Sequence, residues 1–162
     1  MSAQTIVTQT IAITCANGSL AVMRFVLDDS RGIKREGTDA EIAAEIAKAV
    51  LESPCVSWRR IEEADLPSDR DFRNAWRDHG TGIDHDMVKA RAIHMERIRY
   101  ARDEELRATD ALVMRADEQG NRIASDALKA KRQALRDLPA LASAACDAAQ
   151  TIAELKAVQP WA

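Results

Sequence analysis

Residues 85–119 read HDMVKARAIHMERIRYARDEELRATDALVMRADEQ, a run of 35 residues without a proline or a glycine. An unbroken α-helix of this length would be about 50 Å long. Small and apolar residues recur along the run at steps of three and four, which is the spacing of one helical face. Charged residues fill the positions between them. The run therefore predicts one long helix with a packed face and a solvated face.

A second helix is predicted directly after this run, beyond Gly120 and Asn121. Its apolar side repeats at steps of four, three, four and three, which resembles a coiled-coil seam. The residues of that seam are Ala124, Leu128, Lys131, Leu135 and Leu138. Two helices joined by a short link pack antiparallel. Pro139 is expected to end the second helix, and a last helix is expected over residues 147–158.

The N-terminal part, residues 1–64, has the pattern of a small α+β domain. Two β-like runs, at 10–14 and 20–27, flank Asn17-Gly18, which is a strong signal for a β-hairpin. The sequence Thr-Asp-Ala-Glu at residues 38–41 predicts a capping box that begins a helix. Residues 55–61 are predicted to form a third strand. The order β-β-α-β indicates a small sheet with one helix packed on it.

Residues 65–84 are expected to form a connector with one short helix. Ser68 or Asp69 is in position to cap that helix, and Phe72 and Trp76 are four residues apart, so they would share one of its faces. Gly80 is expected to end it in the left-handed conformation. The predicted fold class is therefore α+β and predominantly α. An N-terminal docking domain (1–64) and the connector (65–84) precede a long antiparallel helical hairpin with a C-terminal helix (85–162).

Composition and charge exclude several classes of protein. The chain has 162 residues, of which 46% are hydrophobic and 30% charged, which is typical of a globular protein. Its net charge of −3 argues against non-specific nucleic-acid binding, which needs a basic surface. We expect no membrane span and no signal peptide. Three widely spaced cysteines, Cys15, Cys55 and Cys146, favour free thiols in a reducing compartment.

No motif in the sequence indicates catalysis. His79, His85 and His94 lack the spacing of a helical metal site, and His94 is interpreted as a hydrogen-bonded residue beside the core. The nucleophile motif G-x-S-x-G and the glycine-rich phosphate loops are missing from the sequence. Acidic neighbours such as Glu62 and Glu63 would point apart on regular structure. We therefore expect no enzyme activity, no cofactor and no metal.

Large aromatic and basic residues are the candidates for protein–protein contacts, because tryptophan and arginine are favoured interface anchors. Core packing is the alternative for the aromatic residues. It is favoured for Trp58 and Phe72, whereas both interpretations stay open for Trp76 and Trp161. The arginines of residues 91–102 are interpreted as a salt-bridged or partner-facing surface. The predicted partner-binding residues are Trp58, Arg59, Arg60, Phe72, Arg73, Trp76 and Trp161.

The segment Asp69-Arg70-Asp71-Phe72-Arg73-Asn74-Ala75-Trp76 resembles a D-R-x-F-R-N-A-W element of small proteins encoded in the tail gene region of tailed bacteriophages and prophages. In those proteins the element follows a strand whose end is similar to residues 56–60 here. Residues 87–99, 131–137 and 147–156 are similar to the helices of that family. The resemblance implies a structural or assembly role in a phage tail and implies no chemistry.

Three hypotheses follow from the sequence. The first is a non-enzymatic structural component of the virion, in the tail tip, baseplate or fibre attachment. It would be made in the host cytoplasm, join a homo-oligomer or larger assembly, and contact other tail proteins rather than nucleic acid or membrane. The alternative is a tail or tail-fibre assembly chaperone that is absent from the mature virion. A third hypothesis, an enzyme or a nucleic-acid-binding protein, depends on His79, His85 and the arginines of residues 91–102.

Overall fold

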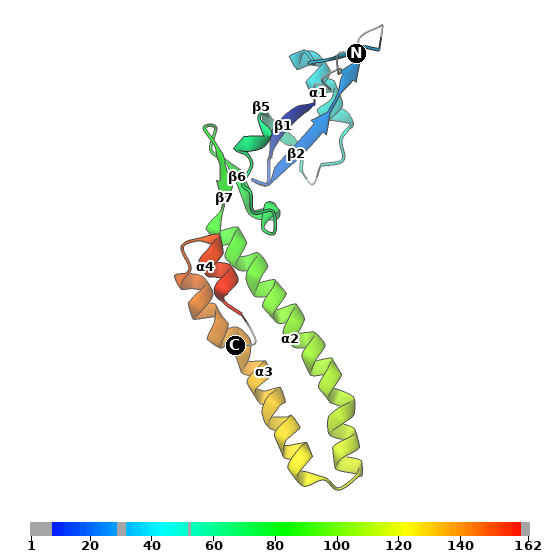
Figure 1. Ribbon diagram of the computed structural model, residues 1–162, viewed down its shortest axis with the longest axis vertical. Coiled ribbons are helices and arrows are strands. Elements are labelled where there is room, and N and C mark those ends of the chain that lie inside the picture. The colour runs from blue at the N-terminus through cyan, green and yellow to red at the C-terminus, as the bar shows by residue number, and fades with distance from the viewer. Residues whose placement is uncertain (1–7, 29–31, 52, 160–162) are drawn as a thin grey trace, which may run out of the picture. The chain divides into compact units, whose positions relative to one another are not determined.

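The structure is a computed structural model that describes residues 8–28, 32–51 and 53–159. The chain divides into two units, one ending at Asp86 and one beginning at Met87. The first unit contains a small antiparallel sheet, and the second consists of helices (Figure 1). The architecture is α+β and predominantly α, which confirms the predicted fold class.

The main sheet of the first unit has the strand order β2-β1-β5, with both pairs antiparallel. Strand β1 spans Gln9–Cys15, β2 spans Leu20–Phe25 and β5 spans Cys55–Ile61. The predicted hairpin between β1 and β2 is confirmed. At its turn Gly18 has a φ of 72°, which glycine adopts without the steric cost of a side chain.

Helix α1 spans Asp39–Lys48 and covers one face of this sheet. It begins with the predicted capping box. The Thr38 hydroxyl accepts the N–H of Glu41, and the Glu41 carboxylate accepts the N–H of Thr38 at 2.8 Å. These bonds satisfy donors that a helix N-terminus leaves unpaired. The core between helix and sheet contains Ile11, Ile13, Cys15, Ile42 and Ile46.

The segment expected to be a connector covers the opposite face of the sheet. A core cluster there joins Ala12 and Ile61 of the sheet to Leu66, Trp76 and Ile83. Strand β1 is therefore buried from both sides, as a central strand requires. The smaller elements of the first unit are β3 (Leu27–Asp28) paired with β4 (Lys34–Arg35), β6 (Trp76–Asp78) paired with β7 (Ile83–His85), and the 3-10 turns η1 (Glu63–Asp65) and η2 (Arg73–Ala75).

The short helix expected to carry Phe72 and Trp76 is not formed. Only the single turn η2 separates these two residues, and Trp76 begins strand β6. Gly80, with a φ of 83°, lies in the turn between β6 and β7 instead of ending a helix. A helix of two turns is marginal in water by itself. Pairing β6 with β7 and burying Trp76 against the sheet therefore outweigh the local helical pattern.

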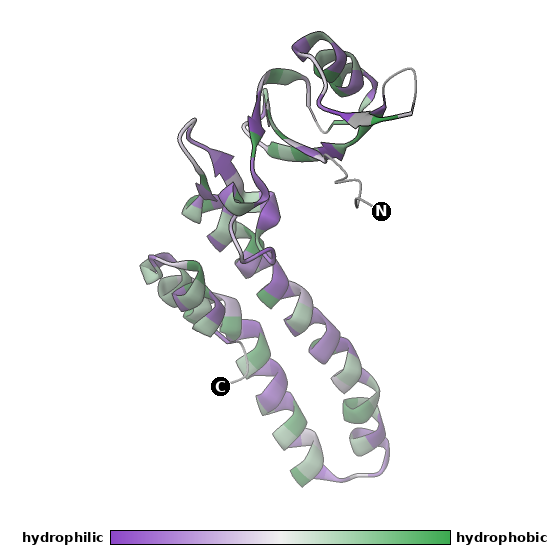
Figure 2. Cartoon of the chain, turned by 45° about the horizontal axis from the view of Figure 1, so that its top comes forward, coloured by the Kyte–Doolittle hydropathy of each residue, from purple (hydrophilic) through white to green (hydrophobic). Residues whose placement is uncertain are grey.

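The second unit contains the predicted helical hairpin. Helix α2 spans Met87–Glu118 and α3 spans Arg122–Ala148, and the two pack antiparallel (Figure 1). Hydrophilic residues are interspersed along the full length of both helices (Figure 2). Three ion pairs link the two helices. They are Glu105 with Lys131, Asp110 with Arg132, and Asp117 with Lys129.

The connection between α2 and α3 is a three-residue link. Gly120 has a φ of 66°, and its N–H donates to the carbonyl of Asp117. The N–H of Asn121 donates to the carbonyl of Ala116, which completes a Schellman motif. The side chain of Asn121 also caps α3 by accepting the N–H of Ala124 at 3.1 Å. The link thus ends α2 with a Schellman motif and begins α3 with an asparagine cap.

The expectation that Pro139 ends the second helix is wrong. Helix α3 continues through Pro139 to Ala148. A proline inside a helix removes one backbone hydrogen bond and costs about 3 kcal/mol. Beyond the proline, Ala142 and Cys146 are buried in the packing of this unit. Burial of that last stretch outweighs the cost of the proline.

Helix α4, Ile152–Ala157, contacts α2 and completes the second unit. Its Leu155 is fully buried. The Arg91 side chain of α2 donates two hydrogen bonds to the carbonyl of Ala149, at 2.7 and 3.2 Å. His94 Nε2 lies 2.9 Å from the carbonyl oxygen of Val158. His94 is thus a hydrogen-bonded residue beside the core, as predicted, and it holds the C-terminal segment against α2.

Candidate protein-binding surfaces

The residues predicted to bind partners differ in their exposure to solvent. Phe72 is fully buried and Trp76 is 5% exposed, so both are core residues of the first unit. Trp58 is half-buried and Arg73 is exposed. Trp161 lies outside the described residues. A surface for partners in the first unit must therefore be built from Trp58, from Arg73 and from neighbours that the sequence alone does not bring together.

Arg60 has a structural role between strand β5 and helix α1. Its guanidinium carbon is 5.7 Å from the centroid of the Trp58 ring, which is within the range of a cation–π contact. Its Nη1 is 2.7 Å from Asp39 Oδ1, and its Nη2 donates to the carbonyl of Gly37 at 3.0 Å. Arg60 thereby fixes the N-terminal end of α1 to the sheet.

Arg59 lies on the opposite face of the sheet and pairs with Asp78 of β6. Its Nε is 2.8 Å from Asp78 Oδ2, and its Nη2 is 2.9 Å from Oδ1. The hydrogen bonds from Arg59 hold the pKa of the Asp78 carboxyl below its usual range, and they raise the pKa of Arg59. A two-point contact of this kind is specific for arginine and carboxylate. Arg59 therefore anchors the β6–β7 hairpin to the sheet.

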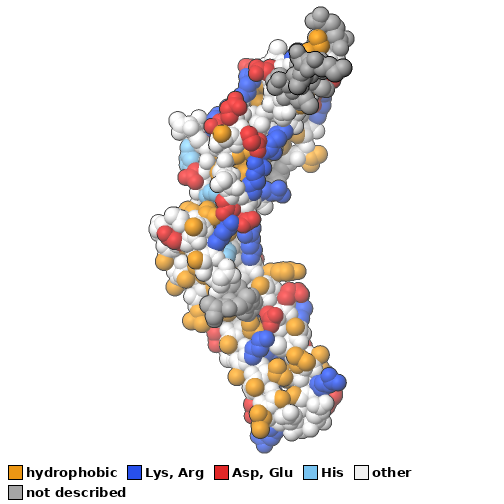
Figure 3. Space-filling view, viewed as in Figure 1, with side chains coloured by type: hydrophobic (Ala, Val, Ile, Leu, Met, Phe, Trp, Pro, Cys, Tyr) orange, Lys and Arg blue, Asp and Glu red, His pale blue; other side chains and the backbone are white. Residues whose placement is uncertain are grey.

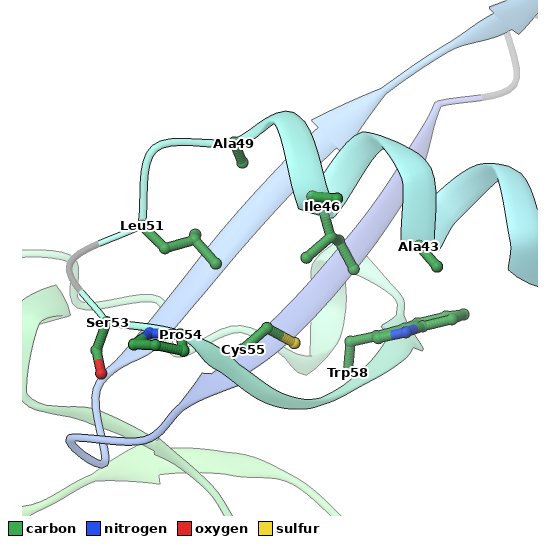
Figure 4. Close-up of a pocket in the computed structure, with 9 residues that line it drawn as sticks. Ala43, Ile46, Ala49, Leu51, Ser53, Pro54, Cys55 and Trp58 are labelled. Atoms are coloured by element: carbon green, nitrogen blue, oxygen red, sulfur yellow. The ribbon is translucent and has the colours of Figure 1, made fainter.

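An open groove of about 550 Å³ lies between α1 and β5 (Figure 4). Ile46 and Leu51 line it from above, and Pro54, Cys55 and Trp58 line it from below (Figure 4). Strand β5 is an edge strand, because within the described residues it pairs with β1 alone. The groove therefore exposes apolar side chains beside main-chain groups of a sheet edge.

A second pocket, of about 260 Å³, lies on the other face of the sheet. The described residues that line it are Leu20, Val22, Arg24, Arg70, Arg73, Asn74 and Trp76. It brings together two of the predicted partner-binding residues, Arg73 and Trp76. Sequence reasoning missed the contribution of β2, because no local pattern places Arg24 beside the segment around Arg70.

The carboxylate of Glu63 stands between two arginines at the border of this pocket. Arg24 donates to it from Nε and Nη2, at 3.0, 2.8 and 2.9 Å, and Arg70 Nη2 donates to it at 2.5 Å. Hydrogen bonds first from Arg70 and then from Arg24 lower the pKa of Glu63. The single carboxylate of Glu63 therefore pairs with two guanidinium groups.

The helical hairpin exposes several large hydrophobic side chains. Nine such residues are exposed in the described part of the chain, and six of them lie on α2 or α3: Val88, Tyr100, Leu112, Met114, Ile123 and Leu141. Leu112, Met114 and Ile123 lie close to the connection between the helices, and Ile123 is 87% exposed. Hydrophobic side chains are visible at this end of the hairpin (Figure 3). These three residues near the connection are here called the hairpin tip; Leu112 and Met114 are two positions apart on α2, so their side chains lie on different faces of the helix.

The described residues contain no group of three or more His, Cys, Asp or Glu side chains arranged to hold a metal ion. None of their helices has the length and apolar character needed to cross a membrane. The three cysteines are free; Cys15 and Cys146 are buried, whereas Cys55 is exposed in the groove of Figure 4.

Residues 95–146 match the model of a family described as phage tail assembly chaperone protein. No curated protein matches the chain, and no solved structure matches it. The matched residues cover most of α2, the connection and most of α3, including the hairpin tip. The D-R-x-F-R-N-A-W element lies outside them, so its assignment stays a prediction. The match supports a role related to phage tails.

Proposed function

We propose that this chain is a phage tail assembly chaperone that binds a tail protein before assembly and leaves before the virion matures. The match of residues 95–146 to the chaperone family carries the proposal. The first hypothesis from the sequence, a structural component of the virion, takes second place because the matched family is described by an assembly role. Both hypotheses imply contacts with other tail proteins.

The exposed apolar side chains of the hairpin support binding of a client protein. Five of the six, all except Val88, lie within residues 95–146. Burying one such side chain in an interface removes apolar surface from water and contributes roughly 1.5–3 kcal/mol. Ile123 of the hairpin tip, 87% exposed and the most exposed of these five residues, is therefore expected to contribute most to the client contact.

The ion pairs between α2 and α3 support a binding surface that exists before the client arrives. Lys131 Nζ is 3.0 Å from Glu105 Oε2, and Lys129 Nζ is 3.1 Å from Asp117 Oδ1. The Ser125 hydroxyl adds a hydrogen bond to Asp117 beside the connection. A surface that is already ordered loses less conformational entropy on binding. The hairpin therefore presents its tip without first having to fold around a partner.

The proposed activity is non-covalent. We propose that the chain acts by binding tail proteins, without a catalytic step, a cofactor or a metal, and without contacts to nucleic acid or membrane. Its net charge of −3 supports protein partners over a polyanion.

Quantitative mass spectrometry of purified virions and of lysate from infected cells tests this proposal. A chaperone is expected in the lysate, bound to an unassembled tail protein, and at no fixed copy number in virions. A constant stoichiometric copy number in purified virions would establish the structural role instead and would reject the chaperone.

A pair of matched variants tests the role of the hairpin tip. Ile123 is the second residue of α3, and Val88 is the second residue of α2. Aspartate is favourable in the first turn of a helix, so Ile123→Asp and Val88→Asp both preserve the helices. Ile123→Asp is expected to reduce capture of the tail protein strongly, and Val88→Asp, outside residues 95–146, to leave it unchanged. Equal capture by both variants would reject the tip as the client site.

A further inference from the structure

We propose that the pocket lined by Arg24, Arg70, Arg73, Asn74 and Trp76 binds a carboxylate side chain in an acidic segment of a partner protein. The pocket belongs entirely to the first unit and lies outside residues 95–146. The inference therefore does not rest on the proposed chaperone function, and each can fail without the other.

Arginine is the commonest residue type in the lining of this pocket. Three of its seven described lining residues are arginines, and none of the seven is acidic. Glu63, at the border, is the carboxylate that pairs with both Arg24 and Arg70. Each of these guanidinium groups has five N–H donors, so both retain donors after binding Glu63. The site can therefore accept one more negative group.

Arg73 supplies the open binding position. Its side chain is exposed, and within the described residues it makes no hydrogen bond or ion pair. The η2 turn contains Arg73 and Asn74, and both residues line the pocket together with Arg70 and Trp76. The guanidinium fork of arginine matches the two oxygens of a carboxylate. Arg73 therefore has both the positive charge and the available N–H donors to bind a carboxylate of the partner protein.

Three apolar side chains contribute to the lining of the pocket. Leu20 and Val22 of β2 are half-buried, and Trp76 is 5% exposed. A charge-assisted hydrogen bond is stronger where neighbouring groups exclude water. An aliphatic stem, such as that of glutamate, can contact these apolar side chains while its carboxylate binds Arg73. These two features favour a carboxylate on a peptide over a free inorganic anion.

A nucleic acid is disfavoured as the occupant. Asp69 and Asp71 flank Arg70 in sequence, and Glu63 remains at the border. A polyanion needs a row of cations along its backbone, and these carboxylates would repel its neighbouring phosphates. An isolated carboxylate avoids that repulsion. The partner segment is therefore an acidic residue set among apolar residues of a protein.

Nuclear magnetic resonance of the full-length protein tests the site. The probes are the capped peptide acetyl-Ala-Leu-Glu-Leu-Ala-amide, its glutamine analogue, inorganic phosphate and a short single-stranded DNA. The glutamate peptide is expected to shift the Trp76 indole and the Arg73 and Asn74 backbone signals in a saturable way. The glutamine peptide is expected to bind about tenfold more weakly, because it lacks the charge.

Two charge-matched variants separate this site from general electrostatics. Arg73→Gln is expected to weaken binding of the glutamate peptide about tenfold. Arg77→Gln removes the same charge from an exposed position that does not line the pocket, and is expected to leave binding unchanged. Equal effects of both variants, tighter binding of phosphate or DNA, or no shift at about 5 mM peptide would overturn the proposal.

Discussion

Trp76 and His85 face each other across the β6–β7 hairpin, and the indole Nε1–H donates a hydrogen bond to His85 Nε2 at 3.1 Å. Their ring centroids are 6.5 Å apart, with an interplanar angle of 72°, so the rings meet edge to face. Because Nε2 accepts this bond, the proton of the neutral His85 ring is on Nδ1. The pair joins the core cluster of the sheet to the hairpin that covers it.

Replacing Trp76 is expected to destabilise the first unit in two steps. Trp76→Phe removes the donor to His85 and part of the buried ring, which costs about 1–3 kcal/mol of unfolding free energy. Trp76→Ala also opens a cavity in the cluster with Ala12 and Ile61, which costs about 3–5 kcal/mol. Urea unfolding followed by circular dichroism measures both. Trp58→Phe, at a half-buried position, is the control, and a larger loss there than in Trp76→Phe would contradict this ranking.

The capping box of α1 predicts a specific response to acid. Hydrogen bonds from the Arg35 side chain, and then from the Thr38 backbone, lower the pKa of Glu41 to about 2. A carboxyl with a lowered pKa stabilises the fold above its unfolded value, and this contribution is lost as the pH falls through the folded value. Stability is therefore expected to fall between pH 4.5 and about 2. Carboxyl titration by nuclear magnetic resonance measures it, and Arg35→Gln should return the pKa of Glu41 toward 4.5.

Features of the fold that depend on neighbouring residues were predictable from the sequence. Gly18 in the first hairpin and Gly120 in the helix link both have positive φ, which a glycine beside asparagine indicates. Thr38 and Glu41 form the expected capping box because its bonds span only three residues. The long helix follows from its apolar spacing. In each case the residues that predict the feature are the residues that form it, and they are close together in the sequence.

Features that depend on distant residues were not predictable. Arg24 and Glu63 are separated by 39 residues, so their pairing depends on how the sheet folds. The same is true of Arg59 with Asp78, and of the packing that turns Trp76 into a strand residue. The pocket around Arg73 is a product of these contacts. A single sequence gives the residue types, but it does not show which residues that are far apart in the chain come into contact in the fold.

Pro139 interrupts the hydrogen bonding of α3, and replacing it is expected to stabilise the second unit. Pro139→Ala restores an N–H that can bond to the carbonyl of Leu135 and removes the steric clash of the ring. The gain of about 3 kcal/mol in the helix is offset by about 1 kcal/mol of added freedom in the unfolded chain. Thermal and urea unfolding measure the net gain. Pro67→Ala, outside any helix, is the control that should show no gain.

Gly120→Ala is expected to destabilise the hairpin through the backbone alone. A Cβ at Gly120 would meet no atom within 4 Å, so the substitution causes no steric contact with other residues. Its φ of 66°, however, lies in the left-handed region, where a side chain costs about 1 kcal/mol. Gly82→Ala is the control, because its Cβ also meets no atom within 4 Å and its φ is not in that region. Urea unfolding should show a loss only for Gly120→Ala; equal stability of both variants would mean that the Schellman link does not depend on glycine.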